Sequence, residues 1–171
     1  AVERYARIAA VVQKAIPYPL LIVFVRGNGL AISAADKRIN RADANKIVVE
    51  NIYDTGWIDM PTVCADQQAF LSDFRVSNFS FRDLYVFYQD AVARIIALNC
   101  ARHSGRYEPP SQKTKPNADR LEALRQMEKL LQERTEVRNK LKKEKNLGTQ
   151  VSLNTKIKQL DDRIEAIRND I

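Results

Sequence analysis

Two runs of apolar residues with the same heptad spacing occupy residues 117–171, and they constrain the fold more than any other feature of the chain. Along the second run the gaps are 4, 3, 4, 3 and 4 residues, at Leu153, Ile157, Leu160, Ile164, Ile167 and Ile171. The first run repeats these gaps in the same order, at Ala123, Met127, Leu130, Arg134, Val137 and Leu141. Alternating gaps of three and four residues form the apolar seam of a coiled coil, so each run predicts a helix.

Folding the chain back near residue 147 places every position of the first run opposite one of the second, because the two numbers of each pair add to 294. Gly148 lies at this centre and is expected to adopt the left-handed conformation that ends a helix. Asn117, directly after Pro116, is expected to cap the first helix. The pattern predicts an antiparallel helical hairpin over 117–171, since a long parallel dimer would have no use for Gly148.

Arg134 is the one seam position that is not apolar, and it faces Leu160 in this pairing. We expect its methylene groups to cover the seam while its guanidinium group reaches solvent. A role in selecting the register or a partner is the alternative.

The first part of the chain has a different pattern. Apolar residues spaced by three and four predict a helix over residues 2–15, which Pro17 ends. Runs rich in β-branched and other apolar residues predict three antiparallel strands, at 20–25, 30–35 and 46–53. The first two strands are expected to form a hairpin around Gly27-Asn28-Gly29.

Two more helices are expected before residue 104. One covers residues 65–74, and the other begins with Ser80 as N-cap and Asp83 at the third helical position and runs to about residue 103. Three strands need helices packed over them to bury their apolar side chains. The sequence therefore predicts an α+β domain over 1–103, a small antiparallel sheet covered by helices, followed by the hairpin.

Residues 104–116 contain three prolines and one glycine without an apolar period, which is typical of a linker. The longest apolar run, residues 20–25, is too short for a membrane span. The chain starts within an amphipathic pattern that lacks a signal-peptide layout, so we expect a truncated or processed start. Cys64 and Cys100 do not suggest a disulfide scaffold and are expected to be buried thiols of a reduced, cytoplasmic protein.

A second apolar stripe on the first helix of the hairpin is not used up by the seam: Leu121, Leu124, Met127 and Leu131. It predicts either packing onto the globular half or a docking face for another protein.

Positive charge is concentrated in the second half of the chain. Residues 106–171 hold 16 basic and 11 acidic side chains, a net charge of +5, against +2 for residues 1–105. Six cations gather toward the tip of the predicted hairpin: Arg134, Arg138, Lys140, Lys142, Lys143 and Lys145. Such a cluster is either a solvated helix face or a nucleic-acid-binding surface that neutralises phosphates.

Motifs of well-known enzymes do not occur, since no glycine-rich phosphate-binding loop and no Cys-x-x-Cys is found. The single histidine, His103, is expected to interact with the C-terminal end of a helix rather than to act as a base. Trp57, after Thr55-Gly56, is expected to pack against the core or an edge of the sheet; stacking on a base is the alternative. No cofactor and no metal ion are expected.

Polar residues surround the connection between the second and third strands: Asp36, Lys37, Arg38, Arg41, Asp43, Lys46, Glu50, Asp54 and Asp59. Metal-dependent nucleases place two carboxylates and a lysine on adjacent strands, where a divalent ion activates water. Asp36, Glu50 and Lys37 are the residues available for such a site, although the usual Asp/Glu-x-Lys order is missing. The alternative is a salt-bridged rim formed by Lys37 and Arg38.

Four features together resemble an uncharacterised prokaryotic family designated only as a domain of unknown function: Ala15-Ile16-Pro17-Tyr18-Pro19-Leu20, Ala35-Asp36-Lys37-Arg38, Thr55-Gly56-Trp57 and the terminal helical pair. The resemblance covers nearly the whole chain. It implies a genomic setting beside helicase and DNA-methyltransferase genes of restriction-like, phage-defence islands. It also implies further strand-forming sequence upstream, so that the sheet of this chain is expected to lack one or more strands, and it brings no catalytic residues.

Taken together, these features favour a non-enzymatic accessory or adaptor subunit that docks through its hairpin to a nucleic-acid-processing protein, such as a helicase or methyltransferase. A metal-dependent nuclease and direct, weak, non-specific nucleic-acid binding through the basic tip are the alternatives. A homo-oligomer is compatible with the pattern, and contact with a membrane is not expected.

Overall fold

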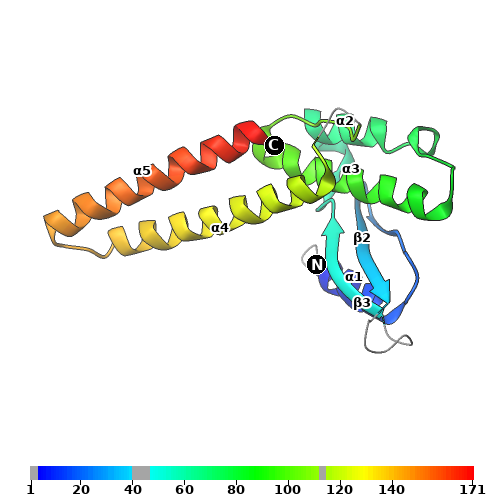
Figure 1. Ribbon diagram of the computed structural model, residues 1–171, viewed down its shortest axis with the longest axis horizontal. Coiled ribbons are helices and arrows are strands. Elements are labelled where there is room, and N and C mark those ends of the chain that lie inside the picture. The colour runs from blue at the N-terminus through cyan, green and yellow to red at the C-terminus, as the bar shows by residue number, and fades with distance from the viewer. Residues whose placement is uncertain (1–3, 40–46, 112–114) are drawn as a thin grey trace.

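The computed structural model describes residues 4–39, 47–111 and 115–171 (Figure 1). The α-helices in these ranges are α1 (Arg4–Ala15), α2 (Ala65–Asp73), α3 (Leu84–Ser104), α4 (Asn117–Leu141) and α5 (Leu147–Asp170). The strands are β1 (Ile22–Arg26), β2 (Gly29–Ile39), β3 (Ile47–Asp54) and β4 (Ile58–Asp59). The predicted α+β fold is confirmed. None of the helices in the described ranges is long and apolar enough to cross a bilayer.

The sheet is antiparallel, with β2 between β1 and β3. Gly27 has a φ of 54° in the tight turn between β1 and β2, which is the predicted hairpin. β4 continues the edge formed by β3 and pairs Ile58 with Leu30. A bulge between Asp36 and Lys37 leaves Glu50 of β3 without a partner residue in β2.

Helices cover both faces of the sheet. On one face lies α1, where the Gln13 amide donates a hydrogen bond to the Ser33 carbonyl (3.4 Å) and the Tyr5 ring contacts Phe24. On the other face lies α3, whose Tyr88 hydroxyl donates to the Ala35 carbonyl at 2.8 Å. The main apolar core lies on this second side and includes Ile32, Tyr53, Ile58, Phe70, Val92, Ile95 and Leu98.

The predicted helical hairpin is confirmed as α4 and α5, which pack together and project from the globular part (Figure 1). All twelve seam positions are buried or half-buried. Five of them form an apolar cluster of their own: Met127, Leu130, Val137, Leu160 and Ile164. The guanidinium group of Arg134 reaches the edge of the seam and donates to Asp161 of α5 at 2.9 Å, so it connects the two arms.

The chain reverses direction over residues 142–146, so the prediction that Gly148 ends the first helix is wrong. Gly148 lies in the first turn of α5 and has no positive φ. The Asn146 side chain accepts a hydrogen bond from the Thr149 N–H at 3.1 Å, and this cap decides where α5 begins.

Two other predicted caps are also displaced. Asp83, not Ser80, is the N-cap of α3, because its carboxylate accepts a hydrogen bond from the Val86 N–H at 2.8 Å. Pro116 takes the N-cap position of α4, and Asn117 is its first helical residue. At α3, local hydrogen bonding by a neighbouring polar residue therefore sets a helix end that the apolar spacing leaves open, whereas Pro116 makes no side-chain cap hydrogen bond.

The described part of the segment expected to be a linker packs onto the globular half. Tyr107 is buried, and its hydroxyl donates to Asp73 of α2 at 2.8 Å. Asp73 also forms an ion pair with Arg94 of α3, with 3.1 Å between Oδ2 and Nε. The Arg94 guanidinium lies 4.6 Å from the centre of the Phe79 ring. These contacts attach the chain after α3 to α2, and α2 to α3.

Candidate functional site

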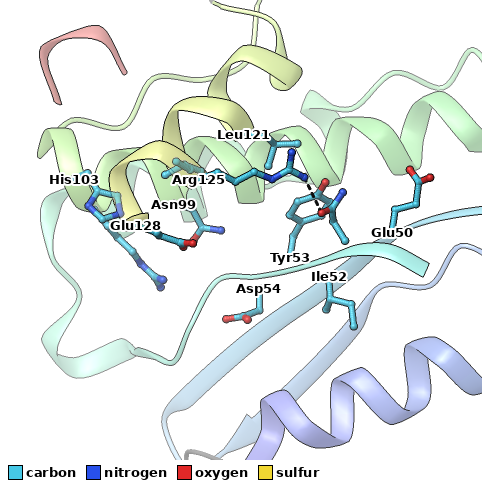
Figure 2. A pocket seen from close by; sticks show the side chains of 12 residues that line it. Glu50, Ile52, Tyr53, Asp54, Asn99, His103, Leu121, Arg125 and Glu128 are labelled. Atoms are coloured by element: carbon cyan, nitrogen blue, oxygen red, sulfur yellow. Dashed lines mark hydrogen bonds between the residues drawn. The ribbon is translucent and has the colours of Figure 1, made fainter. Parts of the chain in front are cut away.

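A pocket of about 500 Å³ opens where the sheet, the end of α3 and the start of α4 meet (Figure 2). The residues that face it come from β3, from α3 and from α4, and they carry charges of both signs. Figure 2 shows Glu50 and Tyr53 directed from β3 toward the helices, whereas Ile52 and Asp54 point to the opposite side of the strand. The pocket therefore has a polar wall built by elements that are far apart in the sequence.

Several polar groups of this wall are paired, mostly with residues beside the pocket. The guanidinium group of Arg125 donates to the Asn51 side chain at 3.0 Å, and Arg102 donates to the Thr55 carbonyl. Gly56 makes the approach of Arg102 possible, since a Cβ atom there would lie 2.3 Å from Arg102 Nη2. The buried side-chain oxygen of Asn99 has no hydrogen-bond partner among the described residues. Arg102, Arg125 and Asn99 were not identified from the sequence, because no motif connects them.

The residues considered for a metal-dependent nuclease do not come together. Asp36 accepts a hydrogen bond from the Tyr53 hydroxyl on the α3 side of the sheet. Lys37, the next residue, points to the other face and donates to the carbonyls of Ile16 and Tyr18, both at 2.8 Å. Glu50 forms an ion pair with Arg38 rather than approaching Lys37.

The salt-bridged rim, the alternative for this region, is present in the pair between Arg38 and Glu50. Arg41, Asp43 and Lys46 lie outside the described residues. In the described ranges, no three His, Cys, Asp or Glu side chains form a group that could hold a metal ion.

His103 lies in the last turn of α3, as expected for a residue near a helix C-terminus. Burial lowers its pKa below the usual value for histidine, the carboxylate of Glu128 raises this pKa, and Arg102 and Arg168 lower it. Because Glu128 belongs to α4 and Arg168 to α5, the charge state of His103 is coupled to the base of the hairpin.

We expect the protein to lose stability as the pH falls from about 7 to about 5. The lowered pKa means that the folded chain binds this proton less tightly than the unfolded chain, so protonation favours unfolding. The substitution His103→Gln should flatten this part of the curve of Tm against pH. Equal slopes for the wild type and the variant would show that His103 makes no such contribution.

The stripe considered for partner docking packs against other parts of the molecule. Leu121 and Leu124 pack against the main core beside the C-terminal Ile171. Met127 is buried within the hairpin, and Leu131 packs against the same cluster. The structure thus uses all four side chains for internal packing, which is the alternative that the sequence left open.

The tip of the hairpin, defined here as residues 138–158, carries nearly all the excess positive charge. It contains seven Lys or Arg residues and one Glu, a net charge of +6, while the whole chain has a net charge of +7. Four of the predicted cations are exposed and form no ion pair within the described residues: Lys140, Lys142, Lys143 and Lys145. Arg138 and Arg134 are less free, because both pair with Asp161.

The acidic residue of the tip is used by the turn itself. The Glu144 carboxylate accepts hydrogen bonds from the N–H groups of Lys145 and Asn146, both at 2.8 Å. This contact holds the carboxylate against the backbone. The lysines around it are left without a neutralising partner in the described part of the chain.

The sequence of this chain matches a known protein family. A sequence model of a family described as a domain of unknown function (DUF4391) matches residues 2–164. The chain belongs to the DUF4391 family. The matched range includes the sheet, the pocket and the hairpin tip, so all of them are parts of the DUF4391 domain. No curated protein and no solved structure matches the chain significantly.

In this DUF4391 chain, Trp57 and Cys100 lie where the sequence predicts them, and Cys64 does not. Trp57 packs as expected, with its ring 6.0 Å from that of Tyr5 and its indole so close to Gly29 that a Cβ there would lie 2.2 Å away. Cys100 is buried, but Cys64 is exposed, so the prediction of two buried thiols is wrong for Cys64. Cys64 is the N-cap residue of α2, where its N–H donates to the Gln67 side chain at 3.3 Å.

Proposed function

We propose that this DUF4391 protein is a non-enzymatic accessory subunit that contacts nucleic acid through the tip of its helical hairpin. The observation that carries the proposal is the concentration of charge, since the tip holds a net +6 of a total +7. An arm that projects from the globular part presents this charge to a partner (Figure 1). Such a series of lysines is suited to bind the regularly spaced phosphates of a nucleic acid, because each contact between a lysine and a phosphate releases condensed counterions.

The geometry supports contact with the backbone of the nucleic acid rather than with its bases. Lysine side chains position a protein on phosphates and carry little sequence information. The described tip offers no exposed aromatic side chain for stacking, and its exposed apolar residues are Leu147 and Val151. Binding is therefore weak, independent of sequence and sensitive to salt.

The accessory role agrees with the genomic setting that the family resemblance implies, beside helicase and DNA-methyltransferase genes. In this proposal the helicase or methyltransferase performs the chemistry. The separation of Asp36 from Lys37 on opposite faces of the sheet removes the main reason to propose a nuclease in this chain. Because the apolar stripe of α4 packs internally, we propose that a protein partner binds elsewhere on the surface.

Replacing Lys140, Lys142, Lys143 and Lys145 together with glutamine should remove most of the binding to duplex DNA. The logarithm of the binding constant falls with the logarithm of salt concentration by about 0.9 per phosphate contact, so the slope should flatten by about three to four units. Only Lys140 lies within α4, where glutamine is a good helix former, and the other three lysines lie in the turn, so the hairpin should remain folded. Fluorescence anisotropy with a labelled 20-base-pair duplex over a salt series measures the slope.

The matched control removes four exposed cations from the globular half by substitution with glutamine: Lys14, Arg75, Arg82 and Arg106. It changes the net charge equally and should leave the slope nearly unchanged. Equal effects of the two quadruple variants would refute contact through the tip. The same samples, incubated with Mg²⁺ or Mn²⁺, should return the DNA uncut, and cleavage that Lys37→Ala abolishes would refute the non-enzymatic role.

A further inference from the structure

β1 is an edge strand without the features that protect such strands. One side of β1 pairs with β2, and no described residue pairs with its other side. β3, the opposite edge, has a bulge and the charged Glu50, both of which hinder pairing with another strand. β1 reads Ile-Val-Phe-Val-Arg, with no bulge and no charge before Arg26, so its free backbone groups are open to an additional strand.

Apolar side chains are exposed on both sides of this edge. Val23 and Val25 are 58% and 72% exposed on one face of β1. On the other face, Ile8 and Val11 of α1 are also exposed and lie three residues apart, hence on one side of the helix. Exposed apolar side chains gathered on both sides of an edge strand are typical of an interaction site on a folded protein.

A small groove runs between α1 and the free edge. It has a volume of about 170 Å³, and its walls include Tyr5 and Ile8 of α1, Phe24 of β1, and Trp57. Arg4 and Arg26 also face it. Since the side chains of a strand alternate between two faces, a strand added beside β1 would direct every second side chain toward this groove.

The surroundings of the edge are basic. Residues 4–35 contain four cations, Arg4, Arg7, Lys14 and Arg26, and no Asp or Glu. All four are exposed, and none has an ion-pair partner within the described ranges. The acidic residues Asp54 and Asp59 belong to β3 and β4, beyond β2, and Asp54 is occupied by the Tyr5 hydroxyl at 2.8 Å.

We infer that the free edge of β1 binds an extended, acidic segment of a partner protein, which adds a strand to the sheet. Backbone hydrogen bonds to β1 supply the affinity, as in other cases of strand addition. The side chains of the segment that face α1 enter the groove, where apolar ones contact Phe24 and carboxylates meet Arg4 and Arg26. This surface is separate from the hairpin tip and does not depend on nucleic-acid binding there.

Charge and hydrogen bonding separate this occupant from others. A second copy of the chain would bring four more cations to the same edge, and like charges across an interface oppose association. A lipid surface would leave the backbone N–H and C=O groups of β1 without partners. An acidic strand pairs its carboxylates with the cations at this edge and its backbone groups with the free N–H and C=O groups of β1.

The test uses the full chain and a labelled nine-residue peptide, followed by fluorescence anisotropy. Every second residue of the peptide is in turn valine or glutamate, and the residues between them are threonine, so that one face of the added strand carries both apolar and acidic side chains. Binding should weaken at least tenfold when Val25→Asp places a carboxylate on the edge. The matched control Leu84→Asp changes an apolar side chain that is 88% exposed at the start of α3, and it should bind like the wild type. Circular dichroism checks that both variants remain folded.

A second peptide carries N-methyl groups on alternate residues, so it keeps every side chain and charge but lacks the donors of one edge. It should bind at least tenfold more weakly than the parent peptide. Equal binding of the two peptides, or no binding of the parent peptide, would overturn the proposal. So would self-association of the wild type, or binding to anionic phosphatidylserine vesicles, that Val25→Asp abolishes, because the edge would then belong to another occupant.

Discussion

Replacing Ile164 with aspartate is expected to lower the free energy of unfolding by about 3–5 kcal/mol. Ile164 is buried in the seam of the hairpin together with Met127 and Leu130. A carboxylate at this position would lose its hydration without gaining a partner, and the apolar contacts of the isoleucine would be lost as well. Urea unfolding of the full chain, followed by circular dichroism, measures the change.

The matched control is Ala166→Asp, two residues further along α5, where the side chain is exposed. It introduces the same charge into the same helix and should cost less than about 1 kcal/mol. Similar losses for the two variants would mean that the seam does not stabilise the arm.

The second large effect is expected for Asp73→Ala, which should destabilise the protein by about 3–5 kcal/mol. This change leaves the nearly buried guanidinium group of Arg94 without its carboxylate and removes the acceptor of the Tyr107 hydroxyl. An unpaired buried charge costs far more than the net contribution of the pair itself. Denaturant unfolding at neutral pH measures the loss.

Two further variants test the reason for this loss. In the double variant Asp73→Ala with Arg94→Met, the buried charge is also removed, so it should be more stable than Asp73→Ala alone. The control Glu165→Ala breaks the exposed ion pair with Arg168 and should cost less than about 0.5 kcal/mol. A double variant that is no more stable than Asp73→Ala would contradict the account based on an unpaired charge.

The hairpin and most strands could be predicted because their signals are local and periodic. The seam from Ala123 to Ile171 repeats over many turns, so single exceptions such as Arg134 do not hide it. Strand β1 was predicted from a short run of β-branched and aromatic residues. In contrast, β4 has two residues and forms only because Ile58 meets Leu30 across the sheet, a contact that no local pattern announces.

Helix ends and polar contacts could not be predicted in the same way. Asp83 and Asn146 were each close to another plausible cap, Ser80 and Gly148, and which residue caps a helix depends on the backbone geometry around it. The pairing of Asp73 with Arg94 joins residues of two helices whose packing the sequence does not show.

The candidate site shows the same limit. The basic residues of the tip could be identified from the sequence, because they are close together along the chain and lie next to a predicted turn between two helices. The fate of Asp36, Lys37 and Glu50 could not, since a bulge in the sheet and the neighbours of each side chain decide where it points.

The length of the hairpin determines how far its tip lies from the globular part. Its first arm, α4, has 25 residues and is therefore about 37 Å long, and packing of Leu121, Leu124 and Ile171 on the core holds its base in place. The seam repeats every seven residues, so removal of another number of residues from one arm would turn the remaining apolar stripe away from its partner. The reach of the tip can thus change only in steps of one heptad in both arms, about 10 Å each. Evolution can lengthen or shorten this reach to suit a partner, but it has to do so by whole repeats.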